Sequence, residues 1–126
     1  HFSNPVVIFD ENNYSTACDM AVILHAAMEN EICKKVLSAR NYTTSCTQQH
    51  PQGITFSSKF LNRIDRKFGK GKVVGAKTGY VNQSRYCAVS MYESEANKKY
   101  ICVTGMAGKA WQTVYDHIAF YQNYCK

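Results

Sequence analysis

Residues 73–84 read Val-Val-Gly-Ala-Lys-Thr-Gly-Tyr-Val-Asn-Gln-Ser, and they are the most informative stretch of this chain. The apolar residues before Lys77 predict a β-strand. Lys77, Thr78 and Gly79 then place an ammonium group, a hydroxyl group and a bare backbone close together. This combination suits a ligand that ends in a carboxylate, because lysine supplies charge, threonine supplies a hydrogen bond and glycine lets a ligand backbone lie against the strand.

Two more strands are expected beyond this one. The predicted strands cover residues 72–78, 85–92 and 100–104. The last two are predicted to form a hairpin through the polar turn at residues 93–99, and Gly105 is expected to end the final strand. Apolar residues fall on both faces of the hairpin strands, so the sheet is predicted to be covered on both sides.

Helices are predicted both before and after the sheet strands along the chain. Ser15 or Thr16 can cap a first helix, whose apolar residues recur every three or four positions: Met20, Ile23, Leu24, Ala27 and Met28. A second helix is predicted at residues 31–37. A closing amphipathic helix is predicted at residues 110–124, with Val114, Ile118 and Tyr121 on one stripe and Trp111 as a packing residue.

The stretch between these helices and the Lys77 strand has weaker signals. Residues 39–52 are polar and turn-rich, and residues 54–60 are predicted to be a strand. The densest basic stretch, residues 63–72, contains two glycines and is interpreted as a solvated loop. The formal net charge of +6 favours contact with anionic polymers, but no signature of a nucleic-acid-binding fold accompanies it, so no specific nucleic-acid binding is expected.

Composition indicates one globular unit. The chain has 126 residues, of which 45% are hydrophobic, enough for a single core. No apolar run approaches the roughly 20 residues of a membrane span. Six cysteines could form three disulfides, but four of them lie in apolar periodic segments, where a free cysteine behaves as a small hydrophobe. Only a Cys87–Cys102 pair on neighbouring strands stays open, and no histidine has the spacing of a zinc ligand.

Several blocks occur in an order that resembles one family. Residues 14–21 read Tyr-Ser-Thr-Ala-Cys-Asp-Met-Ala, residues 60–63 read Phe-Leu-Asn-Arg, and residues 75–80 read Gly-Ala-Lys-Thr-Gly-Tyr. With Asn82-Gln83 and Tyr86-Cys87 after them, they resemble the bacterial serine-type D-alanyl-D-alanine carboxypeptidases, a family of penicillin-binding proteins. The resemblance implies an α/β fold of the α+β type: an antiparallel sheet flanked by helices, as part of a β-lactamase-like transpeptidase domain.

The resemblance also assigns roles around Lys77. Lys77 and Thr78 would hold the terminal carboxylate of a peptidoglycan stem peptide, Gly79 would allow its close approach, and the backbone N–H of Tyr80 would supply one of two oxyanion donors. A serine elsewhere would attack the penultimate D-alanine carbonyl and form an acyl-enzyme, which water would release. The complete domain would also react with β-lactams. The resemblance implies no cofactor.

The nucleophile of this family is missing from the chain. No serine is followed by lysine in a Ser-x-x-Lys pattern, and no Ser-x-Asn pattern occurs. Residues 1–126 are therefore interpreted as the C-terminal portion of one catalytic domain, inactive in isolation. We expect it to join the N-terminal portion of that domain, or a second copy, beside the strand at residues 100–104. The protein is expected outside the cytoplasm, as a secreted, cell-surface or periplasmic bacterial protein.

Two features depart from the family, and two alternatives stay open. Arg85 stands where relatives have a small residue, and Gly105-Met106-Ala107 lacks an arginine that assists carboxylate binding in some members. The first alternative is a non-catalytic peptidoglycan-binding or penicillin-binding relative. The second is a secreted, basic binding module stapled by disulfides.

Overall fold

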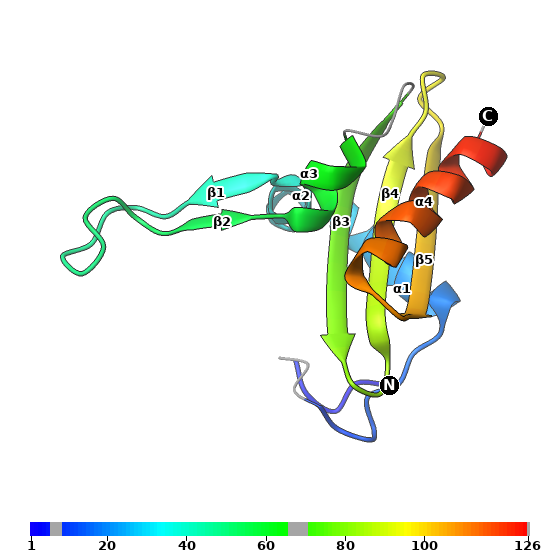
Figure 1. Ribbon diagram of the computed structural model, residues 1–126, viewed down its shortest axis with the longest axis horizontal. Helices are drawn as coiled ribbons and strands as arrows, with labels where there is room; N and C mark the ends of the chain where they lie inside the picture. The colour runs from blue at the N-terminus through cyan, green and yellow to red at the C-terminus, as the bar shows by residue number, and fades with distance from the viewer. Residues whose placement is uncertain (6–8, 66–70, 126) are drawn as a thin grey trace.

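The computed structural model describes residues 1–5, 9–65 and 71–125 and contains four helices and five strands within them (Figure 1). The elements are α1 (Ala17–Glu29), α2 (Glu31–Ser38), β1 (Asn41–Thr43), β2 (Thr55–Ser57), α3 (Lys59–Ile64), β3 (Lys72–Val81), β4 (Arg85–Glu93), β5 (Lys99–Ala107) and α4 (Ala110–Tyr124). None of the helices described is long and apolar enough to cross a membrane.

The main sheet has three antiparallel strands in the order β3-β4-β5. Lys77 lies opposite Val89, and Gly79 lies opposite Cys87. A β-bulge interrupts the pairing between Val73 and Gly75, after which the register runs regularly to the end of β3. Within the described residues β3 and β5 are therefore the two edges of this sheet.

Helices cover both faces of the sheet, as the sequence predicted (Figure 1). On the face that we call the α4 face, α3 and α4 enclose a large core: Phe60, Leu61, Ile64, Val73, Ala76, Ala88, Tyr92, Cys102, Val114, Ile118 and Tyr121. On the opposite face, the α1 face, a smaller core consists of Leu24, Met28, Val89 and Met91. The stripes predicted for the two long helices explain this packing, because their buried members point at the sheet.

The helix predictions are confirmed. Thr16, rather than Ser15, caps α1: its hydroxyl accepts from the Asp19 backbone N–H at 3.0 Å, and the Asp19 carboxylate accepts from the Thr16 N–H at 3.1 Å. This capping box satisfies two donors that the first turn would otherwise leave unpaired. The second and the closing helix also lie where the spacing placed them.

Three strand predictions are wrong in their bounds. The strand expected at residues 72–78 continues past Thr78 to Val81 as β3. The strand expected at residues 54–60 is only Thr55–Ser57, because the Ser58 hydroxyl accepts from the Leu61 N–H and so begins α3, which contains Phe60. The final strand does not end at Gly105 but continues to Ala107, where Met106 adopts a positive φ of 59°. The basic stretch at residues 63–72, interpreted as a loop, is not a loop at its ends: residues 63 and 64 belong to α3, and Lys72 begins β3. Residues 66–70 lie outside the described residues.

All six cysteines are free, and the Cys87–Cys102 hypothesis is wrong. Cys102 in β5 lies opposite Ser90 in β4. Ser90 is three residues further along β4 than Cys87, so the two cysteines are not partners. Burial raises the pKa of the Cys102 thiol to about 12, so this thiol is a packing group. The expected packing role does not extend to the exposed Cys18 and Cys33.

Two surface features stand out from the compact body. The strands β1 and β2 pair as a separate two-stranded ribbon that projects far from the main sheet (Figure 1). The sequence predicted the second of these strands within residues 54–60 but indicated only a turn-rich segment at the first.

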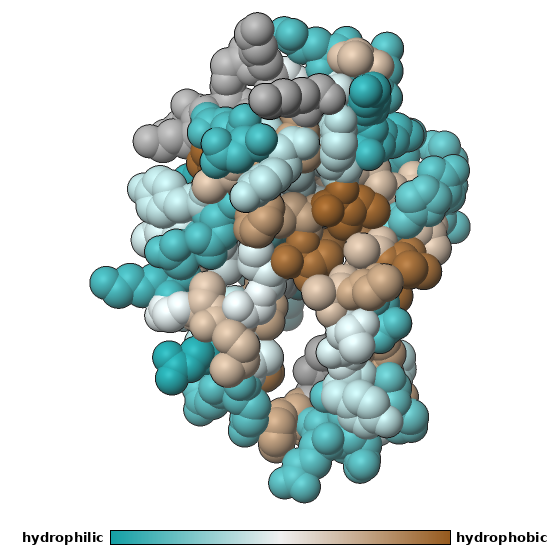
Figure 2. All heavy atoms as spheres, turned by 90° about the vertical axis from the view of Figure 1, so that its right-hand side faces the viewer, coloured by the Kyte–Doolittle hydropathy of each residue, from teal (hydrophilic) through white to brown (hydrophobic). Residues whose placement is uncertain are grey.

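On the side of the molecule that carries β5, apolar groups gather near the middle of the surface (Figure 2). The helices of the α1 face contribute exposed Val22, Ile32 and Val36 to the molecular surface.

Candidate functional site

Lys77, Thr78, Gly79 and Tyr80 are consecutive exposed residues on the edge strand β3. Side chains alternate between the two faces of a strand, so Lys77 projects toward the α1 face, like Gly75, and Thr78 toward the α4 face, like Ala76. The Lys77 ammonium donates a hydrogen bond to the Thr78 carbonyl. The structure thus presents a cation and a hydroxyl group on opposite sides of one exposed backbone edge.

Gly79 and Gly75 are glycines for different reasons. A Cβ atom at Gly75 would lie 2.7 Å from the Met28 sulfur, so α1 packs where a side chain would be. A Cβ atom at Gly79 would meet nothing within 4 Å, and Gly79 is not among the residues with positive φ. Neither packing nor backbone conformation within the described chain requires glycine at position 79, which leaves open space beside the strand.

A hollow lies at the same edge. It has a volume of about 180 Å³ and lies between the end of α2, the start of α3 and the strand β3. Its lining residues are Val36, Leu37, Ala39, Ser58, Phe60, Ala76, Lys77 and Thr78. Lys77 and Thr78 therefore form one wall of a recess that is open to solvent and otherwise mostly apolar.

Tyr80 continues the strand toward its turn. Its ring lies 4.5 Å from the ring of Tyr86, and its hydroxyl donates to the Asn82 side-chain oxygen at 2.9 Å. These two contacts hold the exposed ring against the β3–β4 ladder. The Tyr80 backbone, on which the expected oxyanion donor lies, is thus part of an anchored strand end.

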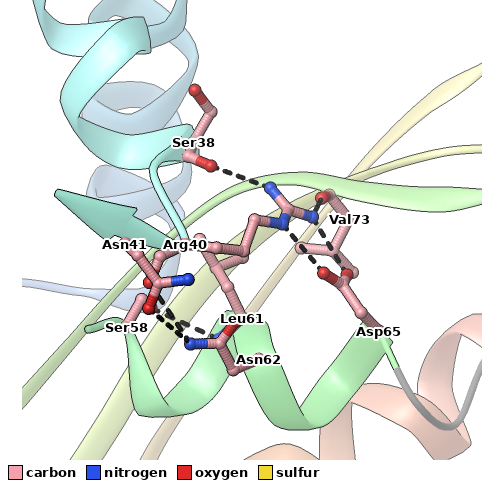
Figure 3. Close-up of polar contacts among 8 residues, drawn as sticks. All are labelled: Ser38, Arg40, Asn41, Ser58, Leu61, Asn62, Asp65 and Val73. Carbon is pink, nitrogen blue, oxygen red and sulfur yellow. Dashed lines mark hydrogen bonds and ion pairs between the residues drawn. The ribbon is translucent and has the colours of Figure 1, made fainter.

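Arg40 ties β3 to both neighbouring helices (Figure 3). Its guanidinium donates to both carboxylate oxygens of Asp65, at 2.8 and 2.9 Å, just beyond α3. It also donates to the carbonyl of Ser38 at the end of α2 and to that of Val73 in β3, both at 2.8 Å. A planar guanidinium suits this role, because its fixed donors reach several acceptors at once. The contacts position α2 and α3, which form the other walls of the hollow.

The Asn-Arg pair of residues 62 and 63 also acts within the scaffold. The Asn62 amide donates to the Arg40 carbonyl at 3.2 Å. The Arg63 guanidinium lies over the ring of Trp111, a cation–π contact between α3 and α4. Trp111 is partly buried against the large core, which confirms it as a packing residue.

A buried polar network on the α4 face escaped the sequence analysis. His117 Nδ1 lies 2.7 Å from the Ser90 hydroxyl, and His117 Nε2 lies 3.0 Å from the Thr104 hydroxyl. The Tyr121 hydroxyl lies 2.7 Å from that of Ser90 and donates to the Ser90 carbonyl at 2.8 Å. A neutral imidazole protonated on Nδ1 satisfies all these bonds, with Thr104 donating to Nε2.

This Ser–His pair is structural and does not act as a nucleophile. Ser90 and His117 have no exposed surface, so no substrate reaches the hydroxyl. Burial lowers the pKa of His117 to about 4, only partly opposed by the nearby Asp116 carboxylate. The imidazole is thus held neutral at the centre of the α4 face.

Arg85 occupies a strained position beside the site. It follows the β3–β4 turn with a φ of 53°, in the left-handed region that favours glycine. Its side chain is exposed. Glycine, which has no Cβ atom, would fit this backbone better, so the departure seen in the sequence also has a conformational cost.

Comparison with solved structures shows a similar fold in part of one known protein. The structure is similar to a crystal structure of D-alanyl-D-alanine carboxypeptidase from Mycobacterium tuberculosis H37Rv, with a TM-score of 0.59 and 18% sequence identity. The alignment covers 88% of this chain and 42% of the mycobacterial one, so the chain spans less than half the length of that protein.

Sequence comparison gives the family. The profile of the D-alanyl-D-alanine carboxypeptidases, Peptidase_S11, matches residues 1–108. The chain therefore belongs to the D-alanyl-D-alanine carboxypeptidase family. No curated protein sequence matches it significantly.

Proposed function

We propose that this chain supplies the carboxylate-binding and oxyanion side of a serine-type D-alanyl-D-alanine carboxypeptidase that cleaves peptidoglycan stem peptides through an acyl-enzyme. The observation that carries the proposal is the exposed edge at Lys77, Thr78 and Gly79, with open space at Gly79 and a hollow alongside. Stem peptides lie outside the cytoplasmic membrane, so the proposal includes an extracytoplasmic location.

Each residue has a distinct task in this proposal. The Lys77 ammonium releases the Thr78 carbonyl and pairs with the terminal carboxylate, and the Thr78 hydroxyl donates a hydrogen bond to it. The substrate backbone then lies along β3 at Gly79, where no side chain intervenes. The backbone N–H of Tyr80 points to the oxygen on which negative charge develops, and such a fixed donor stabilises the transition state more than the ground state.

The attacking serine comes from another polypeptide segment. Ser90 is fully buried, and no serine of the chain has lysine in the Ser-x-x-Lys spacing. We propose that the N-terminal portion of the same domain supplies it and packs against the β5 edge and the exposed apolar residues of the α1 face. A second copy of this chain is the alternative occupant. The complete domain would be acylated by β-lactams.

The test uses the longer protein that contains the serine, with Lys77→Ala and Lys72→Ala as a matched pair. Lys72 begins the same strand, and its exposed ammonium lies 3.7 Å from the Glu93 carboxylate. Lys77→Ala should lower the rate of acylation by a fluorescent penicillin and of D-alanine release roughly 10²–10³-fold, the scale of losing one electrostatic contact in the transition state. Lys72→Ala should leave both rates unchanged.

Three results would contradict the proposal. The first is an unchanged acylation rate in Lys77→Ala. The second is equal loss in both variants, which would indicate a general effect of charge. The third is a stable labelled band from the isolated 126-residue chain, which would place the nucleophile within it. A longer protein without a serine nucleophile would instead favour the non-catalytic, peptidoglycan-binding alternative.

A further inference from the structure

The β1–β2 ribbon has one apolar face that nothing in the described structure covers. Tyr42 and Phe56 are direct partners in its ladder, so their rings project from the same face. They are 59% and 58% exposed, although aromatic side chains of this size are usually largely buried. Ile54, two residues before Phe56, extends this face and is also exposed.

The opposite face of the ribbon is made of hydroxyl and amide groups that pair across the strands. The Ser57 hydroxyl donates to the Asn41 side chain at 2.7 Å, and the hydroxyls of Thr43 and Thr55 lie 2.8 Å apart. These contacts link the two strands on the face opposite to the aromatic rings. The exposed rings are therefore accessible to a ligand.

The ribbon is also free of charge. Residues 41–58 contain no Asp, Glu, Lys or Arg, whereas 19% of the whole chain is charged. Contact with a nucleic acid or another polyanion requires cations, which this stretch lacks. A stable protein interface buries roughly 1,200–2,000 Å². Two strands of three residues each offer much less flat surface than that.

We propose that the aromatic face of the β1–β2 ribbon binds the glycan strand of peptidoglycan, a polymer of N-acetylated amino sugars that is uncharged wherever its carboxyl groups are amide-linked to stem peptides. The apolar C–H face of a pyranose ring stacks on an aromatic ring, and its hydroxyl and acetamido groups bond to neutral polar groups such as those near the rings. The inference rests on the proposed function for the identity of the polymer. It adds a second binding site, for the sugar backbone that carries the stem peptide.

The base of the ribbon connects this site to the Lys77 edge. The Ser58 N–H donates to the Arg40 carbonyl at 2.8 Å, where the two strands leave the body. Ala39 and Ser58, at the two ends of the ribbon, line the hollow beside Lys77. A glycan strand bound to the ribbon would thus lie next to the hollow in which the carboxyl terminus of the stem peptide is proposed to bind.

The test measures binding of the 126-residue chain to N-acetylglucosamine hexamers, by calorimetry and NMR titration. Tyr42→Val and Phe56→Val keep a strand-forming apolar residue but remove the rings. We expect each to weaken binding several-fold and the double variant to weaken it tenfold or more, since each ring supplies its own stacking surface. Tyr124→Val, at an aromatic residue 75% exposed on α4, is the matched control and should bind like the wild type.

Several outcomes would overturn the inference. These are no binding by the wild-type chain, equal weakening by Tyr124→Val, and binding that disappears as salt rises, which would indicate an electrostatic surface. Concentration-dependent association that Tyr42→Val abolishes, without glycan binding, would assign the ribbon to a second copy. The N-acetylglucosamine hexamers carry neither a peptide nor a carboxylate, so their binding does not depend on the proposed peptidase function, and failure of that function would leave this result unchanged.

Discussion

The two faces of the main sheet differ in how completely they are covered. On the α4 face, Ile118 is 8% exposed, and a fully bonded polar network lies beneath the helix. On the α1 face, Ile32 of α2 is 76% exposed, and Val22 and Val36 are exposed as well. Within the described chain, the core on the α4 face contains eleven buried residues and the core on the α1 face only four. Exposed aliphatic side chains beside so small a core suggest a surface that another polypeptide covers.

The largest difference between the faces should appear when the same residue type is truncated on each. Ile118→Ala removes buried atoms from the large core and should lower the free energy of unfolding by about 2–5 kcal/mol. Ile32→Ala should change it by less than about 0.5 kcal/mol, because the side chain is already in water. Chemical denaturation of both variants measures this. Similar losses at the two positions would refute the contrast between the faces.

The second largest effect is a dependence of the folding stability on pH, which comes from the neutral His117 on the α4 face. The pKa of His117 is about 4 in the folded chain and 6.5 as its ordinary value, so the unfolded chain takes up a proton first as the pH falls. Stability is therefore fully present above pH 6.5 and decreases as the pH falls toward 4. The loss is roughly 3 kcal/mol, at about 1.4 kcal/mol per pKa unit.

Denaturation of the wild type and of His117→Gln between pH 7 and pH 4 tests this prediction. Glutamine can still form hydrogen bonds but does not titrate, so the variant should be less stable at pH 7 and should lose less on acidification. The carboxylates are common to both proteins and cancel in the comparison. Parallel pH curves would show that His117 is not the titrating group.

A smaller effect is expected at Arg40, which joins the two faces through β3. Arg40→Ala should cost about 1–2 kcal/mol, a value reduced by the partial exposure of its ion pair with Asp65. Arg40→Lys should restore little of this, because an ammonium group cannot make the same planar set of bonds. Hydrogen exchange of the β3 amides should rise in both variants. Full protection in Arg40→Lys would show that charge alone suffices.

The smallest expected effect is an increase in folding stability. Arg85→Gly relieves a positive φ at the β3–β4 turn and should stabilise the chain by up to about 1 kcal/mol, since this backbone region is strained for residues with a side chain. Thermal unfolding measures it, with the exposed Lys98→Gly as the control at an ordinary φ. A loss of stability in Arg85→Gly would mean that the side chain contributes contacts that outweigh the strain.

The sequence predicted those parts of the fold that rest on periodicity. The stripe of Val114, Ile118 and Tyr121 located α4, and the apolar run before Lys77 located β3. Only the second strand of the ribbon was predicted, within residues 54–60. The first strand, β1, was missed because it has three residues, of which only Tyr42 is apolar, and so shows no apolar period. Phe60 was misplaced because Ser58 acts as a helix cap, which an apolar pattern does not reveal.

The candidate site could be predicted only where its residues are adjacent in the sequence. Lys77, Thr78 and Gly79 form a short motif on one strand, so they could be singled out. The Arg40 contacts and the His117 network join residues far apart in the chain, such as Ser90 and His117, and only the pairing of strands brings them together. For this reason the hollow beside Lys77 could not be foreseen either.

The bulge between Val73 and Gly75 sets the phase of the whole binding strand. One extra residue there lets Val73 point to the α4 face and Gly75 to the α1 face, although they are two positions apart. If the same sequence formed a strand without the bulge, every residue after Val74 would project from the opposite face, and the Lys77 ammonium would change sides with the Thr78 hydroxyl. Deleting one residue between the bulge and Lys77 would thus leave the Lys-Thr-Gly motif intact in the sequence. Its lysine and threonine side chains, however, would project from exchanged faces of the sheet.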